Sequence, residues 1–238
     1  MTPTRHTVEW GNKVIEFSLL RTDRKRVAIE VNPDLSVLVK VPTTAELEPV
    51  LGVVRKKARW ILRQQRYFGQ FAPRTPPRRF VSGETHLYAG RRYRLKVHTV
   101  DGAQFVKLAG GYLHVYCRYA GALDAKRQLL EDWYLQQAVR VMQQRLETCI
   151  DHRVFRDLAL PPMSIRRLRK RWGSCTKSGR VLLNLDLIRA PRNCIDYVIT
   201  HELCHLLVPE HSSAFFRLLD RVQPDWLERK TRLEALLV

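Results

Sequence analysis

The chain has 238 residues, of which 45% are hydrophobic and 27% charged, and this globular composition argues against disorder. Its 42 Lys and Arg residues against 23 Asp and Glu give a formal net charge of +19, which favours nucleic acid, nucleotides or acidic proteins as partners, although an Arg-rich solvated surface explains it equally well. No segment approaches the roughly 18 apolar residues that cross a membrane, and Met1–Trp10 is polar, so we expect neither a membrane protein nor a signal peptide.

Short strands separated by turn signals are predicted for the first 42 residues. Val8–Trp10 and Val14–Phe17 flank Gly11-Asn12, which is typical of a hairpin. Residues 27–31 and 37–41 flank Asn32-Pro33-Asp34 in the same way.

A long helix is predicted at about residues 43–68. Thr43 and Glu46 have the spacing of a capping box, and apolar residues recur at helical intervals from Leu47 onward. The opposite face is basic, with Arg55, Lys56, Lys57, Arg59, Arg63 and Arg66. Such a face can follow phosphates, but a solvated surface is the more common outcome.

A proline-rich segment at residues 71–79 predicts a linker, after which a second β-rich stretch runs to Cys117. A long amphipathic helix is expected from Leu123 to Cys149. We therefore predict an α+β protein with a β-rich N-terminal region, residues 1–120, that contains the one long helix. A mainly helical, metal-binding catalytic region, residues 121–238, follows it.

The chemistry centres on His201-Glu202-Leu203-Cys204-His205, which lies on a predicted helix that begins near Asn193. Two histidines four residues apart project from one helical face and can chelate one ion. Glu202 is offset in angle, so its carboxylate can accept a proton from a metal-activated water without binding the metal. This HExxH spacing predicts a zinc hydrolase.

His211 is the expected third ligand. Pro209 disfavours helix at Val208, so the helix should end near Leu207 and allow His211 to turn back, which leaves a fourth position open for water. Glu210 is the alternative, because two histidines and one carboxylate also form a common zinc site. Metzincins share the histidine spacing, but they have a glycine at the turn where this chain has Val208.

A wider set of residues resembles the YgjP-like metallopeptidase family, which is related to the SprT-like and WLM zinc peptidases. The resemblance is strongest over residues 165–235. It rests on Arg171-Trp172-Gly173-Ser174-Cys175, on Leu183-Asn184-Leu185, on Asp196-Tyr197 before the His-Glu-Leu-x-His run, and on His211-Ser212-x-x-Phe215. One departure is Phe216, where the family often has Trp.

This resemblance implies a zincin-like catalytic part with one Zn²⁺ per chain, held by His201, His205 and His211, with Glu202 as the general base. It also implies protein or peptide substrates, and some related peptidases act on proteins bound to DNA.

Three further residues are candidates for substrate or transition-state contacts. Tyr197 lies one turn before His201 and can stabilise an oxyanion or fill the core. Asn184 can hold substrate backbone or cap local structure, and Trp172 can form a pocket wall or fill the core. Cys175 can approach the metal, although a small buried residue in a tight turn is the commoner role.

Two other functions remain open. Arg166, Arg167, Arg169, Lys170 and Arg171 can line a phosphate site, which would make the enzyme a nucleotide pyrophosphatase. A basic nucleic-acid-binding protein with a structural metal is the third possibility, although a structural zinc usually has four protein ligands. The five scattered cysteines without a Cys-x-x-Cys motif indicate reduced thiols and a cytoplasmic location.

Overall fold

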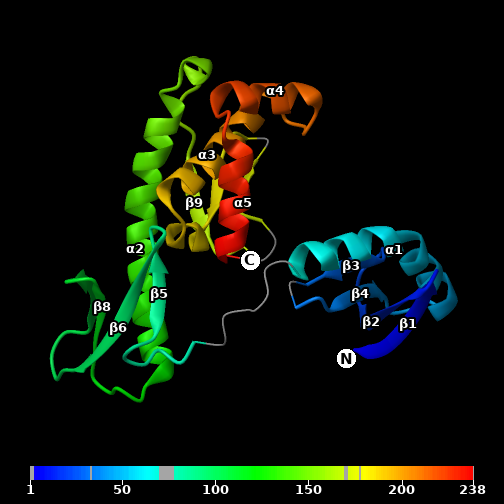
Figure 1. Ribbon diagram of the computed structural model, residues 1–238, viewed down its shortest axis with the longest axis horizontal. Coiled ribbons are helices and arrows are strands. Elements are labelled where there is room, and N and C mark those ends of the chain that lie inside the picture. The colour runs from blue at the N-terminus through cyan, green and yellow to red at the C-terminus, as the bar shows by residue number, and fades with distance from the viewer. Residues whose placement is uncertain (1–2, 33, 70–77, 169–170, 177, 238) are drawn as a thin grey trace. The chain divides into compact units, whose positions relative to one another are not determined.

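The computed structural model describes residues 3–32, 34–69, 78–168, 171–176 and 178–237 (Figure 1). These residues form two compact units, one before and one after residues 70–77. The predicted linker at 71–79 therefore lies almost entirely outside the described residues.

A four-stranded sheet forms the described part of the first unit together with one helix. The strands are β1 (Thr4–Trp10), β2 (Lys13–Thr22), β3 (Ala28–Val31) and β4 (Val37–Pro42), in the order β1-β2-β4-β3. Trp10 pairs with Lys13 around Gly11-Asn12, and β3 pairs antiparallel with β4. Both predicted hairpins are thus confirmed.

Helix α1 (Leu47–Gly69) covers one face of this sheet, where Val50, Val54, Ala58 and Ile61 join the strand residues in one core. The capping-box prediction was wrong, because the helix begins at Leu47 and Thr43 lies in a turn. Arg21 holds that turn by donating from Nη1 to the carbonyls of Thr43 and Ala45 at 2.9 and 2.6 Å.

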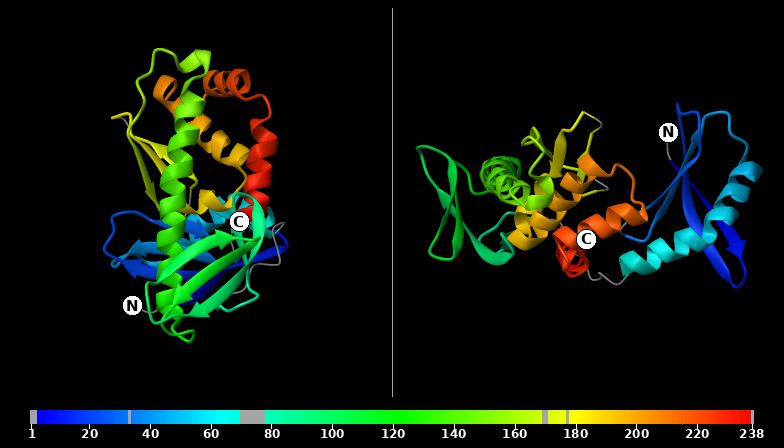
Figure 2. Two further views of the ribbon diagram at one scale, coloured as in Figure 1. Left: turned by 90° about the vertical axis from the view of Figure 1, so that its left-hand side faces the viewer. Right: turned by 90° about the horizontal axis from the view of Figure 1, so that it is seen from above.

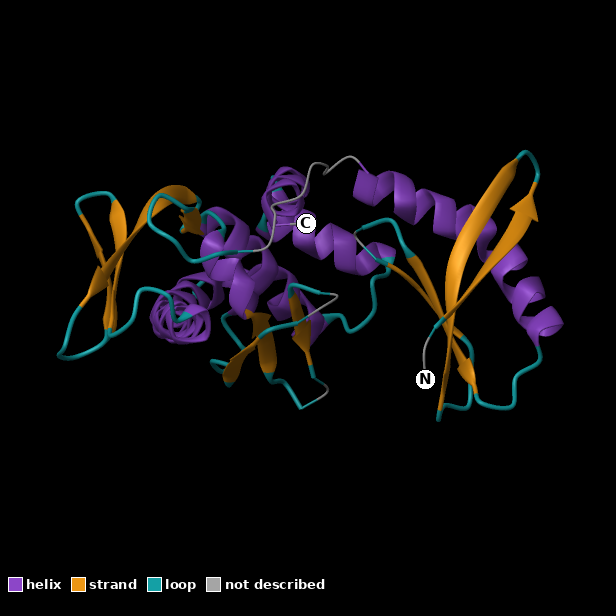
Figure 3. Ribbon diagram, turned by 90° about the horizontal axis from the view of Figure 1, so that it is seen from below, coloured by secondary structure: helices purple, strands orange, loops and turns teal. Residues whose placement is uncertain are grey.

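The second unit begins with another four-stranded sheet, in the order β5-β6-β8-β7 among the described residues. Its strands are β5 (Thr85–Tyr88), β6 (Arg91–Thr99), β7 (Phe105–Ala109) and β8 (Tyr112–Cys117). Helix α2 (Leu123–Ile150) lies beside one face of this sheet, as Figure 3 shows. The last three strands were predicted, whereas β5 was not.

The rest of this unit surrounds a smaller, three-stranded sheet in the described chain, in the order β10-β11-β9. Its strands are β9 (Met163–Arg166), β10 (Gly173–Cys175) and β11 (Val181–Asn184). Helices α3 (Arg192–Leu207), α4 (Ser213–Val222) and α5 (Trp226–Leu237) follow, and short 3-10 turns span Arg153–Phe155 and Leu185–Arg189 (Figure 2).

One hydrophobic core unites the strands of both sheets in this unit with α2, α3, α4 and α5. The core brings Leu113 of β8 together with Met142 of α2 and Ile199 of α3. The boundary between the two compact units along the chain therefore falls at residues 76 and 77, whereas residues 1–120 were grouped from the sequence by their strand content. The predicted α+β class is confirmed, and in the part of the chain that the structure describes no helix is long and apolar enough to cross a membrane.

Candidate metal centre

The end of helix α3 brings three histidines together. The helix carries His201 and His205 and ends at Leu207, because Val208 has an extended backbone with φ of −133° before Pro209. Helix α4 begins four residues after Pro209, where the Ser212 side chain accepts a hydrogen bond from the backbone N–H of Phe215 at 3.4 Å. This turn returns His211 to the face of α3, as the sequence predicted.

The three imidazoles converge through one type of atom. The His211 Nε2 lies 2.9 Å from the His201 Nε2 and 3.1 Å from the His205 Nε2. Of the described residues, these three histidines form the group that can hold a metal ion, with candidate ligand atoms within 4.8 Å of one another. Glu210 is exposed and Cys175 lies on β10, and neither belongs to this group.

Phe215 supports all three rings, a role that was not predicted from the sequence. Its ring is fully buried, and its centroid lies 4.9, 4.5 and 4.8 Å from those of His201, His205 and His211. Its place three residues after Ser212, in the first turn of a capped helix, was the available signal.

The protonation states suit metal binding. Burial, and then the neighbouring histidines, lowers the pKa of His201 to about 3, and burial also lowers the pKa of His205. Neutral imidazole is the form that offers a lone pair to a metal. The His205 Nδ1 lies 3.3 Å from the Val208 carbonyl, which fixes the tautomer with the Nε2 lone pair directed to the centre. Three histidine ligands with an open fourth position fit a catalytic zinc ion.

Glu202 lies beside this centre with a side chain that is only 5% exposed. Burial raises its pKa to about 7, opposed by the positive charge of Arg171 and by a hydrogen bond from the Cys175 backbone. The carboxylate rests directly on Gly173, where a Cβ atom would lie 2.6 Å from the Glu202 Oε1. The glycine of the Trp-Gly-Ser-Cys run is therefore needed because a larger residue would displace the carboxylate.

A cavity of about 1230 Å³ opens over the centre. The three histidines and Glu202 line it together with β10 and residues 158–162. Trp172 and Tyr197, two of the predicted contact residues, also line it. The Tyr197 ring centroid lies 6.0 Å from that of His201, and burial raises the pKa of its phenol, which therefore keeps its proton.

Asn184 does not line the cavity and instead holds the chain that leads to it. Its amide nitrogen donates to the carbonyls of Leu168 and Arg171 at 2.9 and 3.1 Å, and its Oδ1 accepts from the backbone of Asp186 at 3.1 Å. The backbone N–H of Asn184 also donates to the Trp172 carbonyl at 2.8 Å. Of its two predicted roles, the geometry favours local capping.

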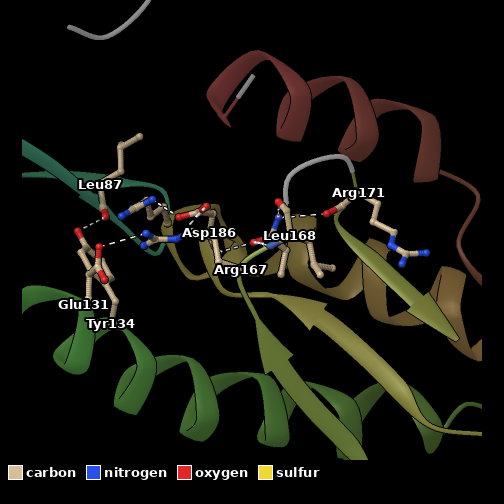
Figure 4. A network of polar contacts seen from close by, with 9 residues as sticks. Leu87, Glu131, Tyr134, Arg167, Leu168, Arg171 and Asp186 are labelled. Carbon is tan, nitrogen blue, oxygen red and sulfur yellow. Dashed lines mark hydrogen bonds and ion pairs between the residues drawn. The ribbon is translucent and has the colours of Figure 1, made fainter. Parts of the chain in front are cut away.

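The described residues of the basic run before Trp172 lie in different places. Arg171 lines it, whereas Arg167 pairs with Glu131 at 3.1 Å and approaches Asp186 at 3.9 Å (Figure 4). Arg166 ends β9 with an exposed side chain, and Arg169 and Lys170 lie outside the described residues. Arg171 is the only Lys or Arg that lines the cavity within the described chain.

Comparisons with known proteins identify the family of this chain. A comparison with curated proteins found no match. A crystal structure of the metallopeptidase zymogen abylysin from Pyrococcus abyssi matches with 25% identity and a TM-score of 0.35, over 39% of this chain and 90% of that chain. The family described as "YgjP-like, metallopeptidase domain" matches residues 25–236. The chain thus belongs to the YgjP-like metallopeptidase family.

Proposed function

We propose that this protein is a zinc-dependent peptidase with one zinc ion per chain, held by His201, His205 and His211. The observation that carries the proposal is the convergence of three imidazole Nε2 atoms beside a buried carboxylate in a large cavity. Family membership implies a catalytic metal, and three histidines are a donor set that zinc commonly uses in catalytic sites.

Glu202 is the proposed general base. When bound, zinc lowers the pKa of water towards about 7 and polarises a carbonyl group. A carboxylate oxygen of Glu202 accepts the proton of the attacking water and passes it to the leaving nitrogen. The pKa of about 7 for this group suits both steps near neutral pH. The protonated Tyr197 phenol lines the same cavity and is the proposed donor to the carbonyl oxygen as it gains charge.

The edge strand β10 supports a peptide as the substrate. It lines the cavity and pairs with β11 on one side, and no strand of the described sheet pairs with its other side. An extended peptide can add to such an edge through main-chain hydrogen bonds. Glu202 receives a hydrogen bond from Cys175 at the end of this strand, which places the base next to the proposed peptide.

The distribution of cations favours a peptide over a nucleoside triphosphate. A triphosphate carries several negative charges and is usually bound by several Lys or Arg side chains or a metal. Arg171 alone supplies such a charge in the described lining, and Arg167 lies outside the lining and is already paired with carboxylates.

The histidine count also favours a catalytic over a structural metal, since structural zinc usually has four protein ligands. The candidate group found among the described residues has three. As part of the proposal we retain a cytoplasmic location, which the five free cysteines support, and protein substrates that include DNA-associated proteins, which the net charge of +19 supports.

Substitution of Glu202 tests this function. Zinc-loaded wild-type protein and Glu202→Gln are incubated with an unfolded protein, a DNA-bound protein and nucleoside triphosphates, and the products are identified by mass spectrometry. We expect the wild type to cleave peptide bonds and the variant to lose at least a hundredfold in rate while retaining its zinc.

Arg166→Gln is a matched control, because it removes an exposed charge outside the cavity lining. Its peptide cleavage should match that of the wild type. Hydrolysis of triphosphates alone would contradict the peptidase proposal, and peptide cleavage that survives Glu202→Gln would contradict the role of the base.

A further inference from the structure

The sheet β5-β6-β8-β7 has one face that the core does not use. Along β6 and β8, Leu95, Leu113, Val115 and Cys117 point into the core beside α2. Because side chains alternate across a strand, the residues between them lie on the other face. We call this the aromatic face, and it comprises Arg92, Arg94, Lys96, His98, Phe105, Lys107, Tyr112, His114 and Tyr116.

Rings on three adjacent strands stack across this face. Phe105 of β7 stacks on Tyr116 of β8 with centroids 4.4 Å apart and planes at 20°. Tyr116 stacks in turn on His98 of β6 at 4.6 Å and 14°. His114 continues the row at 5.1 Å from His98, where their ring nitrogens lie 2.9 Å apart.

The stack ends at an accessible ring. Phe105 is 45% exposed, whereas Tyr116, His98 and His114 are half-buried against one another. A large apolar ring that stays in contact with water does not give the protein the stabilisation that its burial would give. Here it offers a flat surface on which another aromatic ring system can continue the stack.

Cations surround the rings. Arg92, Arg94, Lys96 and Lys107 are all exposed, and the strands of this face carry no acidic side chain from Thr85 to Tyr88, Arg91 to Thr99, Phe105 to Ala109 or Tyr112 to Cys117. The Lys96 Nζ lies 3.7 Å from the centroid of the Tyr112 ring, which keeps one ammonium group at the face. In register, Lys107 is opposite His114 and adjacent to the Phe105–Tyr116 pair.

We propose that the aromatic face binds single-stranded nucleic acid, with a base stacked on Phe105 and backbone phosphates contacting Lys96, Lys107 and Arg94. Aromatic rings with interleaved cations are the two features by which proteins bind single strands, since every base has a π face and every linkage a charge. A duplex hides its base faces within its own stack, so it gains only the charge contacts.

The basic face of α1 has no row of stacked rings among the described residues and provides the comparison. Arg55, Arg59, Arg63 and Arg66 lie along one helical face and are exposed. Charge without stacking attracts any polyanion and does not distinguish a single strand from a duplex. Preference for single strands is therefore the property that separates the two surfaces.

Fluorescence anisotropy of the full chain with labelled 12-nucleotide DNA, the same RNA sequence and a 12-base-pair duplex tests the proposal. We expect either single strand to bind at least tenfold more tightly than the duplex at 0.15 M salt. Phe105→Ala and Tyr116→Ala should each weaken single-strand binding about tenfold, whereas Tyr116→Phe should retain it.

The salt dependence of binding measures the contribution of the charged side chains. For single strands the slope of log K against log salt is about −0.7 per phosphate contact, so Lys96→Ala combined with Lys107→Ala should make it shallower by about 1.4. Arg59→Ala combined with Arg63→Ala removes the same charge from α1 and should leave the preference for single strands unchanged. Apart from the half-buried Tyr116, the substituted side chains are exposed, and unchanged melting temperatures check folding.

Equal affinity for duplex and single strands would overturn the proposal, as would binding lost in the α1 double variant and kept in Phe105→Ala. The proposed peptidase function does not depend on the outcome of these binding measurements. Glu202→Gln should bind the oligonucleotides like the wild type, and Phe105→Ala should cleave an unfolded protein at the wild-type rate.

Discussion

Gly173 and Glu202 share a space too small for one more carbon atom. A Cβ at Gly173 would lie 2.6, 2.9 and 3.0 Å from the Oε1, Cγ and Cδ atoms of Glu202. Gly173→Ala should therefore move the carboxylate and lower kcat about a hundredfold or more, because small misplacements of a catalytic group are costly. Zinc content, measured on the same sample, should not change.

Gly121→Ala is the matched control, because a Cβ there meets no atom within 4 Å. Its turnover should equal that of the wild type. Full activity in Gly173→Ala would show that Glu202 can act from another position.

His86 makes stability depend on pH. It is 4% exposed, and burial, together with the nearby Arg78 charge, lowers its pKa to about 4 from an unfolded value near 6.5. Between these two pH values the unfolded chain binds a proton on His86, whereas the folded chain does not. The stabilisation is thus complete above pH 6.5 and is lost as pH falls towards 4, by about 3 kcal/mol.

Urea unfolding of wild type and His86→Gln across pH 4 to 8 measures this contribution. The free energy of unfolding should fall more steeply with decreasing pH in the wild type than in the variant. The difference in slope should correspond to at most one additional proton bound by the unfolded wild type. Parallel curves would mean that His86 does not titrate differently in the folded state.

A bidentate ion pair joins helices α2 and α3. The Arg145 Nε and Nη2 atoms donate to Asp196 Oδ1 and Oδ2 at 2.6 and 2.7 Å, and both side chains are largely buried. Asp196→Ala would leave a guanidinium unpaired between the helices. We expect it to lower the free energy of unfolding by about 3 kcal/mol, measured by urea denaturation.

The Arg127–Asp124 pair on the surface of α2 is the comparison, with side chains 54% and 82% exposed. Asp124→Ala should cost less than about 1 kcal/mol. Similar losses in the two variants would mean that burial adds nothing to the Arg145–Asp196 pair.

The long elements were predictable from the sequence. The apolar period of residues 123–149 gave α2 nearly to the residue, and Val208-Pro209 gave the end of α3 at Leu207. β5, β9 and β10 have three or four residues each, too few for an alternation to stand out. The α1 start was misjudged because Arg21, distant in sequence, fixes the turn at Thr43.

The candidate site was predictable to the extent that it is local. His201, Glu202 and His205 follow helical spacing, and Pro209 indicated the return of His211. The role of Gly173 depends on Glu202, and that of Asn184 depends largely on the carbonyls of Leu168 and Arg171, so partners distant in sequence left both roles open.

At the scale of the whole molecule, shared cores rather than strand content define the two compact units. The sheet β5-β6-β8-β7 packs with α2 and α3, so the unit that carries the histidines also carries the aromatic face. The net charge of +19 is spread over both units and includes the exposed α1 face and the cations beside Phe105. A peptidase that also holds single-stranded nucleic acid would meet protein substrates on that polymer.

The proposed function depends on the three-histidine metal centre, and metal analysis of three purified proteins tests this centre most directly. Plasma mass spectrometry should find about one zinc per chain in the wild type and in Glu210→Ala, and almost none in His211→Ala. Zinc retained in His211→Ala, or lost in Glu210→Ala, would contradict the three-histidine centre.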